Sequence, residues 1–175
     1  MDKNEAKMYE VFEELGITDF KVVEHQALHS IAESDSFDLS IADLNVKNLL
    51  VKEKKADKYY LILIDEHKKL DTKHFKEVTG WKKVNFSNDE QLLEVLGLPP
   101  LSVTPLSLFN DVDKRVTVVL GKDIVDASDD KTIGHHPCRN NATLVMTKGD
   151  FMKFLKHMGN EVILEEFEAP EPEAE

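Results

Sequence analysis

The stretch Val46-Lys47-Asn48-Leu49-Leu50-Val51 decides the fold, because it places one lysine and one amide at the head of an apolar run. Such a short run, rich in branched aliphatic residues, is typical of a buried strand. A second apolar run at 59–64 follows the polar segment 52–58. Two such runs with a polar connection of this length predict a hairpin. On this pattern alone, Lys47 extends its ammonium group to solvent from the start of the strand.

The segments on either side of this hairpin predict helices and further strands. Apolar residues at helical spacing predict a helix over 3–15, which Gly16 ends. Ser87 and Glu90 form the pattern of a capping box, and an apolar helical face follows them. This pattern predicts the start of another helix. Further helices are expected at 71–78 and 147–159, and further strands at 20–24, 84–86, 116–120, 141–147 and 162–164. The pattern predicts an α+β fold, a compact mixed β-sheet with packed helices.

Length and composition predict one domain without a membrane segment. The chain has 175 residues, of which 41% are hydrophobic, and no apolar run reaches the roughly 18 residues of a membrane helix. The N-terminus lacks the apolar region of a signal peptide, and Cys138 is the single cysteine. We therefore expect a cytoplasmic protein. The domain is expected over 1–164, followed by an acidic disordered tail over 165–175.

The formal net charge of −12 disfavours general binding to nucleic acid, whose affinity depends on contacts to phosphates. Seven of the acidic residues lie in 161–175, and residues 1–160 hold 27 acidic against 22 basic residues, a net charge of −5. Five lysines gather within twelve positions: Lys47, Lys52, Lys54, Lys55 and Lys58. They form either a local basic face or an ordinary solvated hairpin.

Common catalytic motifs are missing from the sequence. It contains no GxSxG, P-loop, GxGxxG, HExxH or CxxC pattern. The run His135-His136-Pro137-Cys138 invites a zinc site or a cysteine nucleophile, but zinc needs spaced ligand pairs and a thiol needs an activating base. By contrast, Pro99, Pro100 and Pro105 stiffen a loop whose preset backbone amides can receive a carbonyl or a phosphate; the alternative is a rigid connector.

Four motifs occur in one order: 46–51, Ser102-Val103-Thr104-Pro105, Asn110-Asp111, and His136-Pro137 followed by 140–143. Together they resemble the YbaK/ProX family of aminoacyl-tRNA deacylases, and most of all its freestanding prolyl-tRNA editing branch (PrdX, or ProXp-ala). The resemblance covers about residues 5 to 160. It implies a hydrolase that acts in trans on alanine wrongly attached to tRNA(Pro). It also implies a mechanism assisted by the substrate, without cofactor or metal, and makes prolyl-tRNA synthetase a candidate partner.

The resemblance also assigns roles to individual residues. Lys47 is expected to contact the phosphate or ribose of the terminal adenosine, Asn48 to orient the substrate backbone, and His136 to line the aminoacyl pocket. The remaining expected substrate contacts are His25, Ser102, Val103, Thr104, Pro105, Gly134 and Pro137. The segment 102–105 corresponds to the loop that faces the ester carbonyl.

Three positions depart from the family pattern. Leu101 stands where the family loop opens with glycine, Val46 replaces the usual threonine before the lysine, and Gln26 replaces the proline after the strand-end histidine. These departures concern the amino-acid preference. Two alternatives therefore stay open: a Cys-tRNA(Pro) deacylase of the YbaK type, and a tRNA-binding regulatory module that has lost hydrolysis.

Overall fold

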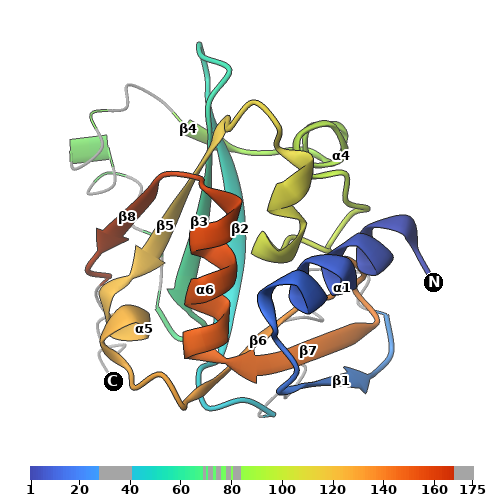
Figure 1. Cartoon of the computed structure of the whole chain (residues 1–175). Coiled ribbons are helices and arrows are strands. Elements are labelled where there is room, and N and C mark those ends of the chain that lie inside the picture. Colours follow the sequence, from blue (N-terminus) through green and yellow to red (C-terminus); the bar gives the residue numbers. More distant parts are fainter. Residues whose placement is uncertain are drawn as a thin grey trace.

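The computed structural model describes residues 1–27, 41–68 and 84–167, together with residues 70, 73, 76, 77 and 80. Two sheets form its framework (Figure 1). A three-stranded sheet has the order β1-β7-β6, and a five-stranded sheet has the order β4-β2-β3-β5-β8. The strands are β1 Phe20–Glu24, β2 Val46–Glu53, β3 Tyr59–Asp65, β4 Val84–Phe86, β5 Val116–Gly121, β6 Thr132–His135, β7 Ala142–Thr147 and β8 Val162–Glu165.

The predicted hairpin lies at the centre of the larger sheet. Its strands β2 and β3 pair antiparallel from Val46 opposite Asp65 to Lys52 opposite Tyr59. On its other side β3 pairs parallel with β5, which in turn pairs parallel with β8. Because β3 has neighbours on both edges and apolar clusters on both faces, six of its seven residues are buried. This explains why its sequence is a continuous apolar run without alternation.

The helices are α1 Lys3–Leu15, α4 Asp89–Leu96, α5 Lys122–Asp126 and α6 Lys148–Met158, with a 3₁₀ helix η1 at Pro105–Asn110. Helix α1 ends as predicted, because Gly16 takes a left-handed conformation with φ 69°. Thr147 caps α6 by accepting a hydrogen bond from the Asp150 amide at 3.2 Å. Helices α1 and α6 lie against one side of the two sheets (Figure 1).

The main core lies between the helices and one face of each sheet. It includes Phe12 of α1, Phe154 of α6, Leu63 of β3 and Leu144 of β7. A smaller cluster covers the opposite face of the five-stranded sheet, where Val51, Ile62 and Val119 pack with Phe167. The strands β2, β3 and β5 therefore bury side chains on both faces, whereas Phe86 of β4 and Leu164 of β8 are exposed.

Several sequence predictions are wrong in detail. Others fall mostly on residues that the structure does not describe. The cap of α4 is Asn88 with Gln91, not Ser87 with Glu90, because the Ser87 hydroxyl donates to the Leu50 carbonyl. There are two sheets instead of one, and α5 was not predicted. Of the helix expected at 71–78, the structure describes Lys73, Lys76 and Glu77, which are helical, and the tail beyond 167 lies outside the described residues. Glu165 closes β8 and Phe167, three residues past the expected boundary at 164, is buried in the smaller apolar cluster.

Candidate active site

Lys47 and Asn48 lie on opposite faces of β2. Val46 and Leu50 contact the main core, whereas Leu49 and Val51 contact the smaller cluster. Since side chains alternate along a strand with regular register, Asn48 points toward the main core and Lys47 toward the outer face of the sheet. The Oδ1 atom of Asn48 is buried and has no hydrogen-bond partner in the described part of the chain.

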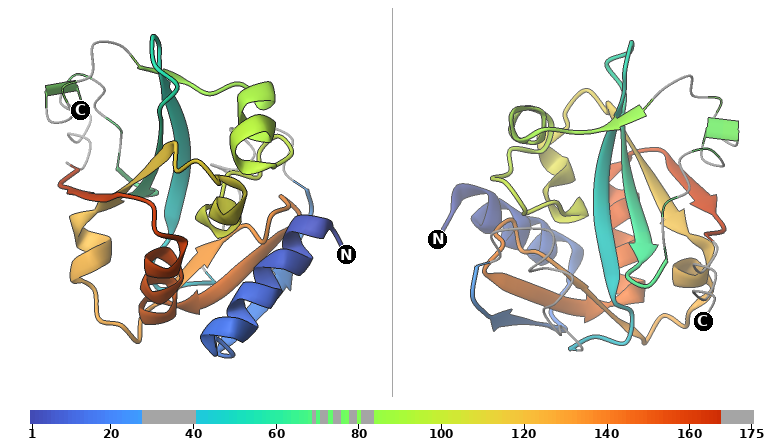
Figure 2. Two further views of the ribbon diagram at one scale, coloured as in Figure 1. Left: turned by 45° about the horizontal axis from the view of Figure 1, so that its top comes forward. Right: turned by 180° about the vertical axis from the view of Figure 1, so that it is seen from behind.

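The outer faces of the two sheets meet where β2 begins. A parallel bridge joins Leu44 to Ile133, and the Leu44 amide donates to the Thr132 carbonyl at 2.8 Å. Ile133 belongs to the main core, so the next residue of β6, Gly134, faces outward. Lys47 therefore lies on the same side of the molecule as Gly134. Figure 2 shows the start of β2 beside β6 and β7 when the molecule is seen from behind.

A threonine on β7 connects two of the predicted site residues. His25 Nδ1 lies 2.9 Å from the Gln26 carbonyl oxygen, and its Nε2 lies 3.0 Å from the Thr143 hydroxyl. A carbonyl oxygen only accepts, so Nδ1 donates to the Gln26 carbonyl, and Nε2 forms the second hydrogen bond with the Thr143 hydroxyl. A Cβ atom on Gly134 would lie 3.1 Å from Thr143 Cγ2. Thr143 thus fixes His25 and fills the space beside Gly134.

His136 is a neutral imidazole with a defined tautomer. Burial lowers its pKa and the nearby charge of His25 acts in the same direction, while a hydrogen bond to the Ala142 carbonyl opposes them. Nδ1 lies 3.2 Å from that carbonyl oxygen and must therefore carry the proton. The lone pair on Nε2 is left to accept a hydrogen bond. At neutral pH the His136 ring can accept a hydrogen bond at Nε2 from a water molecule or an ammonium group.

The proline-bounded loop offers backbone groups instead of hydroxyls. Ser102 and Thr104 are fully buried, with the Ser102 hydroxyl on the Pro100 carbonyl and the Thr104 hydroxyl capping η1 at the Leu106 amide. The amides of Ser102, Val103 and Thr104 donate no hydrogen bond to any described residue. Of these three residues only Val103 is partly exposed, so an oxygen acceptor from solvent can reach an amide of this loop only at Val103. The Val103 side chain packs on the main core, and Pro105 opens η1.

Leu101 occupies a backbone conformation that favours glycine. Its φ angle is 62°, in the left-handed region, where a bulky residue is strained. The sequence departs from the family pattern at this position, but the backbone keeps the shape that a glycine would take. The departure therefore changes the side chain at the mouth of the loop and leaves the path of the loop intact.

His135 and Cys138 are enclosed in the core. His135 is 2% exposed, stacks on Phe151 at 4.4 Å, and has no hydrogen-bond partner at either ring nitrogen among the described residues. Burial lowers its pKa to about 3. Burial raises the pKa of the Cys138 thiol to about 12, so this thiol stays protonated and does not serve as a nucleophile. No group of three or more His, Cys, Asp or Glu side chains in the described ranges could hold a metal ion.

Two polar networks brace the segments around the site. Arg139 donates to Glu5 of α1 at 2.8 Å and to both carboxylate oxygens of Glu24 on β1 at 2.6 and 2.7 Å. Next to η1, the buried Asp111 accepts from the amides of Arg115 and Val116 and from the side chain of Asn160. The Asn110-Asp111 motif thus has a structural role in this chain.

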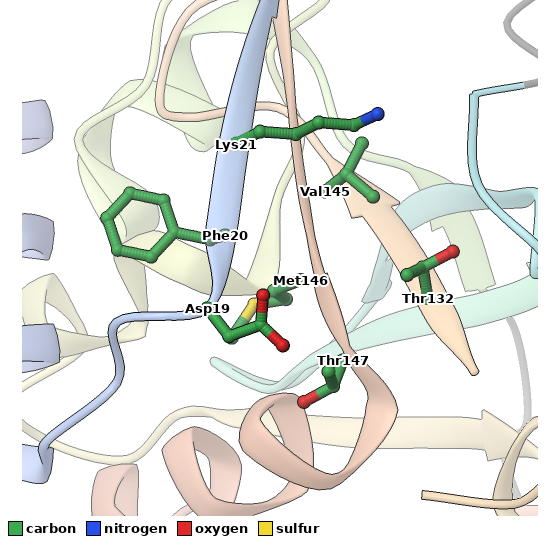
Figure 3. A pocket seen from close by; sticks show the side chains of 7 residues that line it. All are labelled: Asp19, Phe20, Lys21, Thr132, Val145, Met146 and Thr147. Carbon is green, nitrogen blue, oxygen red and sulfur yellow. The ribbon is translucent and has the colours of Figure 1, made fainter. Parts of the chain in front are cut away.

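A hollow of about 180 Å³ lies at the other end of the three-stranded sheet (Figure 3). It is formed around the start of β6 and the end of β7, whereas His136 follows the end of β6. The residues around it are Asp19, Phe20, Lys21, Thr132, Val145, Met146 and Thr147. None of them belongs to the predicted site, so this hollow and the predicted site are separate features.

The structure divides the predicted residues into two groups. Lys47 lies on the outer side with Gly134, and Thr143, also on that side, holds His25. Asn48 and the hydroxyls of the 102–105 loop face the interior. Pro137 is buried beside His136. Sequence reasoning gave no role to Thr143, although it closes the 140–143 motif; no sequence signal pairs it with His25, which lies 118 positions away.

Comparisons with known proteins identify the family of this chain. The family model for the aminoacyl-tRNA editing domain matches residues 25–154. The prolyl-tRNA editing protein ProX of Acetoanaerobium sticklandii is 31% identical over 160 residues, which is 91% of this chain and 94% of that protein. Prolyl-tRNA synthetase associated domain-containing protein 1 of Mus musculus is 29% identical over 150 residues, or 85% and 88% of the two chains.

A solved structure of a candidate trans-editing enzyme for prolyl tRNA synthetase has the same fold. It superposes with a TM-score of 0.64 at 18% identity, covering 97% of this chain and 99% of its own. Fold and sequence together define an α+β domain of the aminoacyl-tRNA deacylase class. The chain belongs to the aminoacyl-tRNA editing family. The predicted fold class and the family resemblance are thereby confirmed. No helix in the described ranges is long and apolar enough to cross a membrane.

Proposed function

We propose that this protein is a trans-editing hydrolase that removes alanine from mischarged tRNA(Pro) in the cytoplasm. The observation that carries the proposal is the bridge between Leu44 and Ile133: Lys47 follows Leu44 at the start of β2, and β6, which holds Ile133, leads directly into the neutral imidazole of His136. The similarity to a prolyl-tRNA editing protein supports the choice of tRNA. Prolyl-tRNA synthetase, which supplies the mischarged product, is its proposed partner.

In the proposed complex, charge and hydrogen bonds hold the aminoacyl ester in place. The Lys47 ammonium group is a point charge suited to a phosphate or ribose oxygen of the terminal adenosine. The amide of Val103, the partly exposed residue of the 102–104 segment, supplies a donor for the ester carbonyl, where negative charge develops during hydrolysis. His136 Nε2 accepts a hydrogen bond from the amino group of alanine or from the attacking water.

The proposed reaction needs no group on the protein to form a covalent bond. Water adds to the ester carbonyl carbon, the bond from that carbon to the ribose oxygen breaks, and the ribose oxygen takes up the proton that the water gives up. The neighbouring ribose hydroxyl assists this transfer. The protonated thiol of Cys138 is consistent with a mechanism without a protein nucleophile. Editing is needed because a proline-activating site rejects the smaller alanine by only about 1–3 kcal/mol.

Hydrolysis of tRNA(Pro) charged with alanine, cysteine, serine or proline tests the proposal. We expect alanine to be released fastest, with no loss of activity in the presence of chelators. Preferential release of cysteine would favour the YbaK type. Binding of tRNA without hydrolysis of any ester would favour the regulatory module. Activity lost to a chelator and restored by zinc would contradict the metal-free mechanism.

Replacement of the lysine tests the site itself. Lys47→Ala is expected to lower kcat/KM by about 100-fold or more, since it removes a charged contact to the reacting end of the substrate. Lys7→Ala, which changes a lysine with a half-exposed side chain on α1, is the matched control and keeps wild-type turnover. Near wild-type turnover by Lys47→Ala, with an unchanged melting temperature, would refute the role of Lys47.

A further inference from the structure

The turn of the β2–β3 hairpin carries lysines that have no ionic partner. Lys54, Lys55 and Lys58 are exposed, and none forms an ion pair with a described residue. The turn projects from the rest of the molecule in every view (Figures 1 and 2). Three ammonium groups are thus presented to solvent at the end of the same hairpin that carries Lys47.

The hairpin turn has a defined shape of its own. Lys52 Nζ donates to the Ala56 carbonyl at 3.1 Å and lies 5.8 Å from the ring centre of Tyr59. The Glu53 amide donates to the Lys58 carbonyl at 3.0 Å. Because these contacts fix the backbone, binding a partner here costs less ordering entropy than it would in a loose loop.

The acidic residues near the turn do not cancel the positive charge of its lysines. Asp57 is bound to Arg115, with Nη1 at 3.1 and 3.3 Å from its two oxygens, and Arg115 also binds Glu94. One guanidinium group faces two carboxylates, so Arg115, Lys52 and the three exposed lysines stand against Glu53, Asp57 and Glu94, which leaves a local charge of +2. The chain as a whole carries a formal charge of −12. A local surface of this kind is therefore needed to attract a polyanion.

The turn lies far enough from Lys47 to contact a part of the substrate beyond its reacting end. Lys54 follows Lys47 by seven residues along β2, a separation of about 23 Å at 3.3 Å per residue. We propose that Lys54, Lys55 and Lys58 bind backbone phosphates of the tRNA acceptor stem while Lys47 holds the terminal adenosine. This inference rests on the proposed function and adds a second contact region to the same substrate.

A charge-neutralised variant with a matched control tests this contact. Lys54→Gln/Lys55→Gln/Lys58→Gln is compared with Lys3→Gln/Lys153→Gln/Lys156→Gln, which removes three exposed lysines from α1 and α6. Deacylation of Ala-tRNA(Pro) is measured between about 50 and 200 mM salt. Three phosphate contacts give a slope of log kcat/KM against log salt of about −2.1 to −2.7. The wild-type enzyme should therefore lose roughly 20- to 40-fold more over this range than the hairpin variant.

A short substrate separates contact with the stem from damage to the site. The hairpin variant should hydrolyse an alanylated oligonucleotide that has only the single-stranded 3′ end as fast as the wild-type enzyme does. Equal salt slopes for the hairpin variant and wild type, or an equal loss on both substrates, would overturn the inference. If the wild-type enzyme hydrolyses neither substrate, the proposed function fails. In that case, binding of uncharged tRNA(Pro) is measured instead. The slope of log Kd against log salt, compared between wild type and the hairpin variant, decides whether the lysines contact phosphates.

Discussion

Replacement of His135 by phenylalanine should remove a pH-dependent loss of stability. The imidazole is buried against Phe151 without a hydrogen bond to any described residue, and its pKa is lowered to about 3 from the usual 6.5. Between about pH 6.5 and pH 3 the His135 imidazole is therefore protonated in the unfolded chain and neutral in the folded chain. Stability rises with pH wherever the unfolded state binds more protons, so His135 destabilises the fold progressively as the pH falls from about 6.5 toward 3.

The size of this effect follows from the shift in pKa. Each pH unit below the unfolded pKa costs about 1.4 kcal/mol, so moving from about pH 7 to pH 5 should cost about 2 kcal/mol through His135 alone. In His135→Phe this contribution is absent. Any difference in packing between the two rings acts equally at both pH values, and the change between them isolates the imidazole.

Urea unfolding at both pH values measures the effect. The wild-type free energy of unfolding should fall by about 2 kcal/mol more than that of His135→Phe. His67→Gln serves as the control, because the His67 side chain is 85% exposed, and it should follow the wild type. Equal pH dependence of wild type and His135→Phe would refute the conclusion that a neutral, unpaired imidazole is buried at position 135.

Two further substitutions test the supports of the site. Arg139→Met should lower the free energy of unfolding by about 3 kcal/mol, because it leaves the buried Glu5 carboxylate without its partner; a loss below about 0.5 kcal/mol in chemical unfolding would mean that the ion pair contributes nothing. Leu101→Gly should raise stability by up to about 1 kcal/mol, because relief of left-handed strain exceeds the entropy that glycine adds to the unfolded chain. A lower melting temperature for Leu101→Gly would show that packing of the Leu101 side chain outweighs the strain.

Local patterns predicted most of the elements, since the forces behind them act between near neighbours. Gly16 ends α1 and Thr147 starts α6 through backbone and side-chain hydrogen bonds within a few residues. Ser87 and Asn88 could both cap α4. A contact with β2 determines which of them does, because the Ser87 hydroxyl donates to the Leu50 carbonyl and leaves the cap to Asn88. The order of the four motifs was also sufficient to indicate the family resemblance.

The sequence by itself determined the hairpin, the order of the elements and the family; only the tertiary structure decided which way the site residues face. The run Leu49-Leu50-Val51 is apolar on both faces because clusters cover both sides of the sheet, so no alternation distinguishes the face of Lys47 from that of Asn48. The same holds for the adjacent histidines: His135 enters the core, while His136 binds the Ala142 carbonyl. Burial on each face depends on residues that are distant in sequence, and these are brought together only by folding.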